Sequence, residues 1–253
     1  MKSGRLRTST TRGALIACLV LIMIPVVCAG SDATAEVSEL SPGEVMALIS
    51  RNEDIQLINT MSTIECLDHT ISGAICIPCP VFDRMAPELL PRKDQLLVFF
   101  CESPSCHRSE HAAEKASLLG YTNIAILKGG LPEWKHAGYD VESKRRIPRR
   151  GIESIKPKRL DSWLDEHKNV LIVDLRSEDL YADNHLPGAV NIPMDVLHER
   201  YLELPMDRML LVVDERGYRS FLGACYLSWK GYVDVKRLFG GMENWKAANV
   251  KKR

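Results

Sequence analysis

The chain has 253 residues, of which 45% are hydrophobic and 26% charged, a globular composition long enough for one large or two ordinary domains. Its 33 basic and 33 acidic residues balance, so the composition gives no reason to expect a nucleic-acid partner.

The first 35 residues have the pattern of a secretory signal peptide. Basic residues come first, an apolar run covers residues 14–27, and Ala33-Thr34-Ala35 offers a small-residue cleavage site. The apolar run is short for a membrane span, and the alternative is an uncleaved membrane anchor. We therefore expect export to a periplasmic or extracellular location after cleavage near Ala35. Such a compartment is oxidising and allows disulfides.

The rest of the chain is predicted to alternate short strands and helices. Ser41 and Glu44 have the spacing of a capping box with Pro42 between them, so a helix is expected through Ile49. Strands are predicted at 55–59, 73–78, 96–100 and 124–127, and the apolar run at 96–100 is expected to be buried. Further helices are expected at 62–67, after Ser109 and from Gly129.

The same order of elements returns in the second half. Residues 143–151 carry five basic residues without apolar periodicity, and they are predicted to be a linker. Several residues recur 111 or 115 positions later: Gly120-Tyr121, Gly129-Gly130 and Trp134 as Gly231-Tyr232, Gly240-Gly241 and Trp245, and Gly73-Ala74 and Pro78 as Gly188-Ala189 and Pro193. A repeat of this length indicates two copies of one domain, over 36–142 and 152–253. Each copy is predicted to be α/β, a small parallel sheet with helices on both faces.

Cys101 directly follows the strand predicted at 96–100 and precedes a predicted helix. Ligands bind at the carboxyl ends of parallel strands, where loop amides and a helix N-terminus favour a thiolate and an adjacent anion. The segment therefore predicts a nucleophile, and the alternative is a half-buried structural cysteine.

The residues around 174–193 resemble the rhodanese family. Asp174-Leu175-Arg176 and His185 to Pro193 look like the first signature of rhodanese domains, and the Gly-Tyr, Gly-Gly and Trp of both copies look like their closing pattern. The chain thus resembles a tandem rhodanese-like protein. The resemblance implies that Cys101 carries a persulfide. The second copy has Asp214 at that position and should be catalytically inactive, because a carboxylate cannot hold sulfane sulfur.

A rhodanese-type sulfurtransferase would move sulfane sulfur from a small-molecule donor such as thiosulfate to a thiol or cyanide acceptor, with a protein thiol as a further partner. The resemblance implies no cofactor and no metal ion. His107 and Arg108 could attract an anionic donor, whereas the charge of Glu102 opposes it. The implied substrate-binding loop consists of Glu102, Ser103, Pro104, Ser105, Cys106, His107, Arg108 and Ser109.

The loop after Cys101 differs from its counterpart in the second copy. Ser109 follows Cys101 by eight positions, whereas Ser220 follows Asp214 by six. The wider loop keeps phosphatase or arsenate-type chemistry as an alternative, although Arg108 lacks the C-x5-R spacing. Cys106 could also resolve a Cys101 persulfide as a disulfide. A non-enzymatic redox or sulfur-species sensor using both cysteines is therefore the competing function.

The other cysteines, histidines and tryptophans are expected to be structural. The first copy has five cysteines, which would allow two disulfides and one free nucleophile. A metal site formed by Cys66 and His69 with the C-x-x-C of Cys76 and Cys79 is the alternative. Residues expected to pack in the core or near a turn are Trp134, His185, Cys225 and Trp245.

Overall fold

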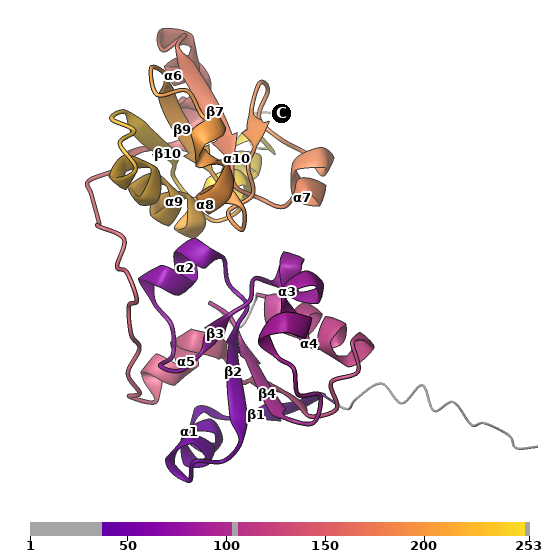
Figure 1. Ribbon diagram of the computed structural model, residues 1–253. Coiled ribbons are helices and arrows are strands. Elements are labelled where there is room, and N and C mark those ends of the chain that lie inside the picture. Colours follow the sequence, from indigo (N-terminus) through magenta and orange to yellow (C-terminus); the bar gives the residue numbers. More distant parts are fainter. Residues whose placement is uncertain (1–36, 103–105, 251–253) are drawn as a thin grey trace, which may run out of the picture. The chain divides into compact units, whose positions relative to one another are not determined.

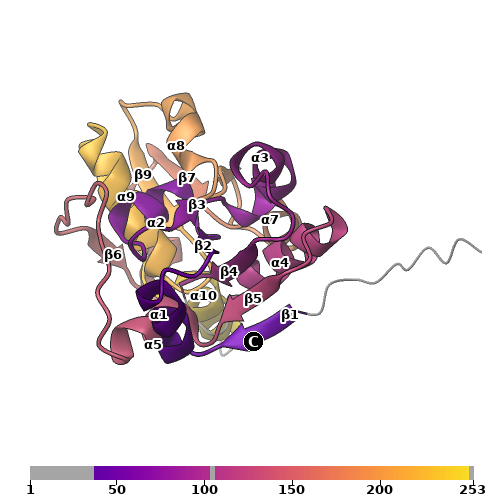
Figure 2. The ribbon, with the colours of Figure 1, turned by 60° about the horizontal axis from the view of Figure 1, so that its bottom comes forward.

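The computed structural model describes residues 37–102 and 106–250, and it contains two five-stranded parallel sheets (Figure 1). The strand order is β1-β5-β4-β2-β3 in the first sheet, which can be followed in Figure 2, and β6-β10-β9-β7-β8 in the second. The two orders are equivalent strand for strand, which confirms the predicted repeat and the α/β class. The predicted signal peptide with its cleavage site lies outside the described residues, as do Ser103, Pro104 and Ser105.

The first domain follows the predicted pattern closely. Ser41 caps the first helix, with its side chain accepting from the Glu44 amide and Glu44 reaching back, as the capping box predicted. The strand expected at 73–78 is shorter because it is an edge strand that pairs only with the end of β2. Three elements, β1, η1 and α3, were not predicted. The elements are β1 Val37–Leu40, α1 Pro42–Ser50, β2 Ile55–Asn59, α2 Thr63–Asp68, β3 Ile75–Cys76, η1 Cys79–Val81, α3 Phe82–Leu89, β4 Leu96–Phe100, α4 Arg108–Leu118, β5 Ile124–Leu127 and α5 Gly130–His136.

The second domain repeats these elements after the segment predicted to be a linker. Residues 143–151 contain no helix or strand. The elements that follow are β6 Glu153–Ile155, η2 Pro157–Arg159, α6 Leu160–Glu166, β7 Val170–Asp174, α7 Glu178–Asp183, β8 Val190–Asn191, α8 Leu197–Arg200, η3 Tyr201–Glu203, β9 Met209–Val213, α9 Tyr218–Trp229, β10 Val235–Leu238 and α10 Gly241–Val250.

Alternation along the central strand β4 explains why helices cover both faces of the first sheet. Val98 and Phe100 belong to a core cluster with residues of α1 and α5. Leu97 and Phe99 point to the opposite face and pack with residues of α3 and α4. Successive side chains of a strand point to opposite faces, so a strand buried on both sides is continuously apolar.

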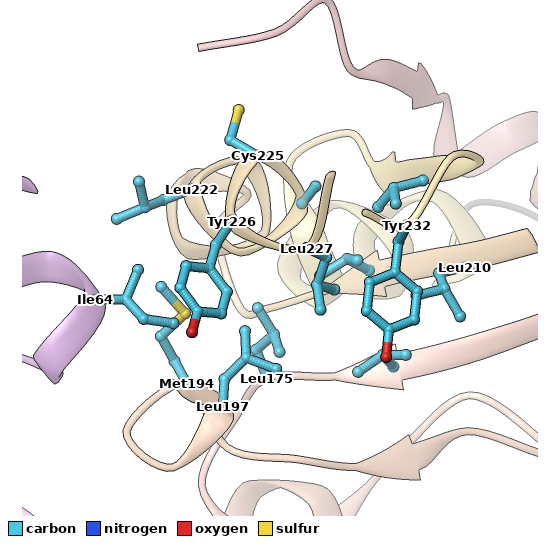
Figure 3. Close-up of a cluster of buried hydrophobic side chains, with 14 of the residues drawn as sticks. Ile64, Leu175, Met194, Leu197, Leu210, Leu222, Cys225, Tyr226, Leu227 and Tyr232 are labelled. Atoms are coloured by element: carbon cyan, nitrogen blue, oxygen red, sulfur yellow. The ribbon is translucent and has the colours of Figure 1, made fainter. Parts of the chain in front are cut away.

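The second domain has the same two-sided core, and one of its clusters receives a residue from the first domain. Ile64 of α2 packs with Leu175, Met194 and Leu197 in this cluster (Figure 3). Ile147, from the predicted linker, is fully buried in the same cluster. Both domains accordingly belong to one compact unit of the chain.

The residues that the sequence predicted to be structural lie in the cores or beside a turn. Trp134 and Cys225 are buried in the cores, and Trp245 packs against the second core. His185 stacks on the ring of Tyr181 beside the turn that leads to β8. Within the described ranges, each helix is too short or too polar to cross a bilayer.

Candidate active site

Cys101 lies directly after β4, at the edge where the carboxyl ends of the parallel strands meet. Its carbonyl oxygen accepts a hydrogen bond of 3.0 Å from the amide of Leu131 in α5. Gly130 adopts a φ of +60°, and a Cβ there would lie 2.5 Å from the Cys101 oxygen. The backbone at Cys101 is therefore held against the N-terminus of α5, and this close approach requires glycine.

Asp214 occupies the equivalent place in the second domain. It follows β9, its carbonyl accepts from the Met242 amide at 2.8 Å, and Gly241 approaches it as Gly130 approaches Cys101. The Asp214 carboxylate accepts from the Gly217 amide at 2.7 Å and from the Arg219 amide at 2.9 Å. The amide donors of this loop are thus directed at an anion, and the chain's own carboxylate occupies them.

The sulfur of Cys101 is nearly inaccessible to solvent, with an exposed fraction of 2% for the residue. Its Sγ donates to the carbonyl oxygen of Cys106 at 3.0 Å and lies 3.6 Å from the hydroxyl of Ser109. A carbonyl oxygen can only accept, so the thiol of Cys101 is the donor in this contact.

Cys106 lies beside the guanidinium of Arg108. Its Sγ accepts a hydrogen bond of 3.1 Å from Nε of Arg108, the first residue of α4. A hydrogen bond from Cys101 and the charge of Arg108 lower the pKa of Cys106 to about 5, against the opposing effect of burial. The guanidinium of Arg108 therefore favours an anionic sulfur at Cys106. The thiolate expected at Cys101 stays a prediction.

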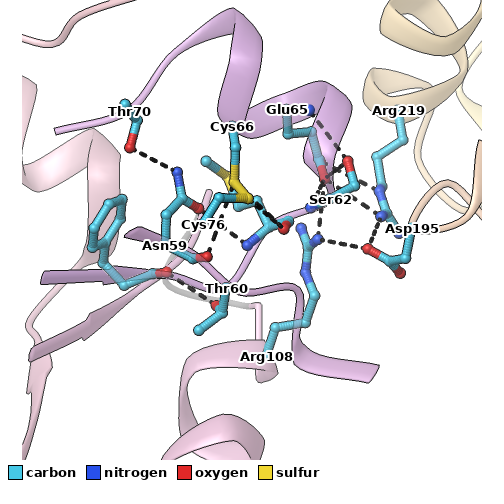
Figure 4. The surroundings of a disulfide bond; sticks show 12 residues. Asn59, Thr60, Ser62, Glu65, Cys66, Thr70, Cys76, Arg108, Asp195 and Arg219 are labelled. Carbon is cyan, nitrogen blue, oxygen red and sulfur yellow. Dashed lines mark hydrogen bonds and ion pairs between the residues drawn. A yellow bond between two sulfur atoms is a disulfide. The ribbon is translucent and has the colours of Figure 1, made fainter. Parts of the chain in front are cut away.

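Arg108 belongs to a cluster of two arginines and two carboxylates, drawn in Figure 4. Its Nη1 lies 3.1 Å from Glu65 and 3.6 Å from Asp195. Arg219 lies 3.4 Å from Glu65 and 3.1 Å from Asp195. Burial would raise the pKa of Glu65, but the two arginines outweigh it and hold that pKa well below its ordinary range. Arg108 is thereby directed at Cys106 and the carboxylates, while His107 remains exposed.

Sequence reasoning missed Glu65, Asp195 and Arg219 as neighbours of the site. Glu65 also forms a capping box with Ser62, and this local role accounts for only part of the contacts of Glu65. Arg219 had a detectable signal, because it lies 111 positions after Arg108, the same offset as the Gly-Tyr and Gly-Gly repeats.

Glu102, the residue after Cys101, is paired with His69. Nε2 of His69 lies 2.7 Å from Glu102, and its Nδ1 lies 3.0 Å from Asp68. Burial alone would lower the pKa of His69, but hydrogen bonds with Asp68 and Glu102 raise it to about 9. The charge of Glu102 is therefore balanced by an imidazolium at neutral pH. No sequence pattern joins these residues, which lie 33 positions apart.

The cysteines outside the loop form one disulfide in the described part of the chain, between Cys66 and Cys76 (Figure 4). Cys79 is a buried free thiol whose pKa is raised chiefly by burial. The first domain thus has one disulfide, not the two that its five cysteines would allow, and the C-x-x-C cysteines Cys76 and Cys79 are not bonded to each other. Among the described residues, no group of three or more His, Cys, Asp or Glu side chains could hold a metal ion.

Comparisons with known proteins bear on both halves of the chain. Residues 41–137 and 156–248 each match the Rhodanese-like domain family. The chain is similar to a sulfurtransferase of Allochromatium vinosum, with 32% identity over 94 residues that make up 37% of this chain and 88% of that protein. It is also similar to thiosulfate sulfurtransferase GlpE of Shewanella oneidensis, with 37% identity over 87 residues, 34% of this chain and 86% of that protein. A solved structure of a thiosulfate sulfurtransferase from Pseudomonas aeruginosa is similar at 25% identity and a TM-score of 0.38, covering 82% of this chain and 44% of that one.

Proposed function

Because the chain belongs to the rhodanese-like domain family, we propose that it is a sulfurtransferase in which Cys101 carries sulfane sulfur as a persulfide. The observation that carries this proposal is the place of Cys101, at the carboxyl end of β4 and against the start of α5. Two relatives that each match about a third of this chain are named as sulfurtransferases, which supports the same activity here.

The proposed reaction needs no oxidant or cofactor. Cys101 first loses its proton, for which the Cys106 thiolate is an acceptor within hydrogen-bond reach. The Cys101 thiolate then attacks the outer sulfur of thiosulfate, the sulfur–sulfur bond of the donor breaks, and sulfite leaves with the electron pair. A thiol or cyanide acceptor next attacks the outer sulfur of the persulfide and restores the Cys101 thiolate.

The surroundings of Cys101 support an anionic donor. Ser109 offers a hydroxyl 3.6 Å from the Cys101 sulfur, and α4 begins at Arg108, so its N-terminus faces the loop. Below about pH 9 the charge of Glu102 is balanced by protonated His69, so repulsion between Glu102 and anionic thiosulfate is reduced.

We further propose that the second domain performs no sulfur transfer of its own. Asp214 stands where Cys101 stands in the first domain, and its two carboxylate oxygens accept from the loop amides that would otherwise face an anion. The variant Asp214→Cys in a Cys101→Ser background tests why the second domain is inactive. A persulfide on this variant would show that the second loop lacks sulfur transfer only because it lacks a cysteine.

The proposed function is tested by intact mass after incubation with thiosulfate. The protein is expected to gain one sulfur atom and to form thiocyanate when cyanide is added. Cys101→Ser should abolish both results, whereas the matched control Cys79→Ser should leave them unchanged. A wild-type protein that gains no sulfur would overturn the proposal.

The proximity of Cys101 and Cys106 favours a sensor as the second candidate function. Cys101 Sγ lies 3.0 Å from the Cys106 carbonyl, so the two cysteines are neighbours, as a switch between dithiol and disulfide requires. The same assay separates the two functions, because a sensor would gain no sulfur and would show a reducible bond between these cysteines after mild oxidation.

We also propose that the protein is exported. The Cys66–Cys76 disulfide supports this proposal, because disulfides persist mainly in oxidising compartments. N-terminal sequencing of protein recovered from the cell envelope or medium is expected to begin near Glu36. Recovery of the unprocessed chain in the cytosol, with Cys66 and Cys76 reduced, would contradict it.

A further inference from the structure

The two loop cysteines differ in access to solvent. Cys101 has an exposed fraction of only 2%, whereas Cys106 is partly exposed. A persulfide on Cys101 would project from a buried sulfur. An acceptor as large as a protein thiol would reach Cys106 more readily than Cys101.

The two thiols also differ in charge. Arg108 donates to Cys106 Sγ at 3.1 Å, so an anionic sulfur is stabilised at this residue. Cys101 instead donates its proton to the Cys106 carbonyl at 3.0 Å. The pair therefore consists of one ready nucleophile, Cys106, and one protonated thiol with an acceptor already in place.

We propose that Cys106 is a second sulfur-carrying residue, which takes sulfane sulfur from Cys101 and presents it to the acceptor. This inference rests on the proposed persulfide at Cys101. It assigns the two cysteines separate tasks, with Cys101 receiving sulfur from the donor and Cys106 delivering it.

The transfer step balances without any other reactant. The proton that Cys106 accepted from Cys101 first passes to the anionic Cys101 persulfide, which leaves Cys106 as the thiolate. This thiolate attacks the outer sulfur of the persulfide, a new bond forms between Cys106 Sγ and that sulfur, and the bond to Cys101 Sγ breaks. Cys101 leaves with the electron pair and takes up the proton of the persulfide, which restores its hydrogen bond to the Cys106 carbonyl. The product is a persulfide anion on Cys106 beside the guanidinium of Arg108.

A competing step would use the same two cysteines differently. If Cys106 attacked the inner sulfur instead, a Cys101–Cys106 disulfide would form and hydrogen sulfide would leave. That outcome consumes the sulfane sulfur and delivers none, so it distinguishes a resolving thiol from a sulfur carrier.

The position of the sulfur can be read directly in the unmutated protein. The full chain is loaded with thiosulfate carrying a heavy isotope in its outer sulfur, and persulfides are trapped by rapid alkylation. Cleavage after Glu102 and Glu110 separates the Cys101 peptide from residues 103–110, which contain Cys106. The label is expected first on the Cys101 peptide and then on the Cys106 peptide, without release of sulfide.

Variants test whether the second position matters for delivery. Cys106→Ser also removes the proton acceptor of Cys101, so the variant is loaded to completion before the acceptor is added and only the transfer is timed. Transfer of the labelled sulfur from Cys101 to a protein thiol should then slow at least about tenfold. Cys79→Ser removes another free thiol of the same domain and should load and transfer like the unmutated protein.

The outcomes separate this inference from the function on which it rests. Loading that stays entirely on Cys101, or Cys106→Ser transferring at the unmutated rate, overturns the relay and leaves the sulfurtransferase intact. Sulfide release with a Cys101–Cys106 disulfide likewise overturns the relay. If no sulfur is gained at all, both proposals fail.

Discussion

His69 makes a specific part of the folding free energy depend on pH. It lies between the carboxylates of Asp68 and Glu102, at 3.0 and 2.7 Å, and its side chain is only 17% exposed. Burial opposes its protonation, but the two hydrogen bonds raise the pKa from the ordinary 6.5 to about 9. We predict that His69→Gln, which keeps hydrogen-bonding groups but cannot be protonated, abolishes this dependence.

The size and sign of the effect follow from linkage between protonation and folding. A rise in pKa from 6.5 to about 9 corresponds to about 3 kcal/mol, at about 1.4 kcal/mol per pKa unit. Solvent reduces this value because Glu102 is 44% exposed, so about 3 kcal/mol is an upper limit. A raised pKa stabilises the fold fully below pH 6.5, and the stabilisation disappears as the pH rises through 9.

Urea unfolding at pH 6 and pH 9.5 measures the difference. The unmutated protein should lose up to about 3 kcal/mol more than His69→Gln between the two pH values. Other groups that titrate in this range contribute equally to both proteins, and His136→Gln, at an exposed histidine, serves as the matched control. Equal losses in the unmutated protein and His69→Gln, or an NMR titration of His69 centred near 6.5, would refute the reasoning.

Three further predictions concern stability and the geometry of the site. Glu65→Gln leaves the guanidiniums of Arg108 and Arg219 to share the single carboxylate of Asp195, and we expect a loss of about 3–5 kcal/mol in urea unfolding. Removing the Cys66–Cys76 disulfide, which joins residues 10 positions apart, should cost about 2–3 kcal/mol in the same assay. Gly130→Ala and Gly241→Ala should each cost about 1–2 kcal/mol or more because φ is positive at both, but only Gly130→Ala should slow persulfide formation at equal folded fraction.

Each of these has a result that would contradict it. A Glu65→Gln protein as stable as Glu114→Gln, an exposed helix control, would mean that the arginine cluster does not stabilise the fold. Unchanged urea midpoints in the Cys66→Ala/Cys76→Ala protein would show that the disulfide constrains little. Equal slowing of persulfide formation by both glycine variants would mean that the contact at the Cys101 carbonyl does not position the reacting loop.

The sequence by itself determined the fold and the place of the candidate nucleophile. Strands β2, β4 and β5 coincide with the strands predicted at 55–59, 96–100 and 124–127. The sequences of β4 and β5 are apolar throughout, because a strand buried on both faces must be continuously apolar. Recurrence of the Gly-Tyr and Gly-Gly pairs predicted two equivalent domains, and the resemblance to rhodanese domains, whose reactive residue ends the fourth strand, aligned Cys101 with Asp214. Both facts depend on local pattern and spacing, which a linear chain displays directly.

Only the tertiary structure decided which groups surround that nucleophile. Arg108 faces Cys106 and the Glu65 carboxylate, His69 meets Glu102, and Cys66 bonds Cys76 rather than leaving the C-x-x-C pair to close. These partners come from loops and helix ends, and the distances between them depend on how α2 and α4 pack. Spacing along the chain does not reveal those distances. The acidity of Cys106 therefore emerges from packing, although the residue types that produce it were visible from the start.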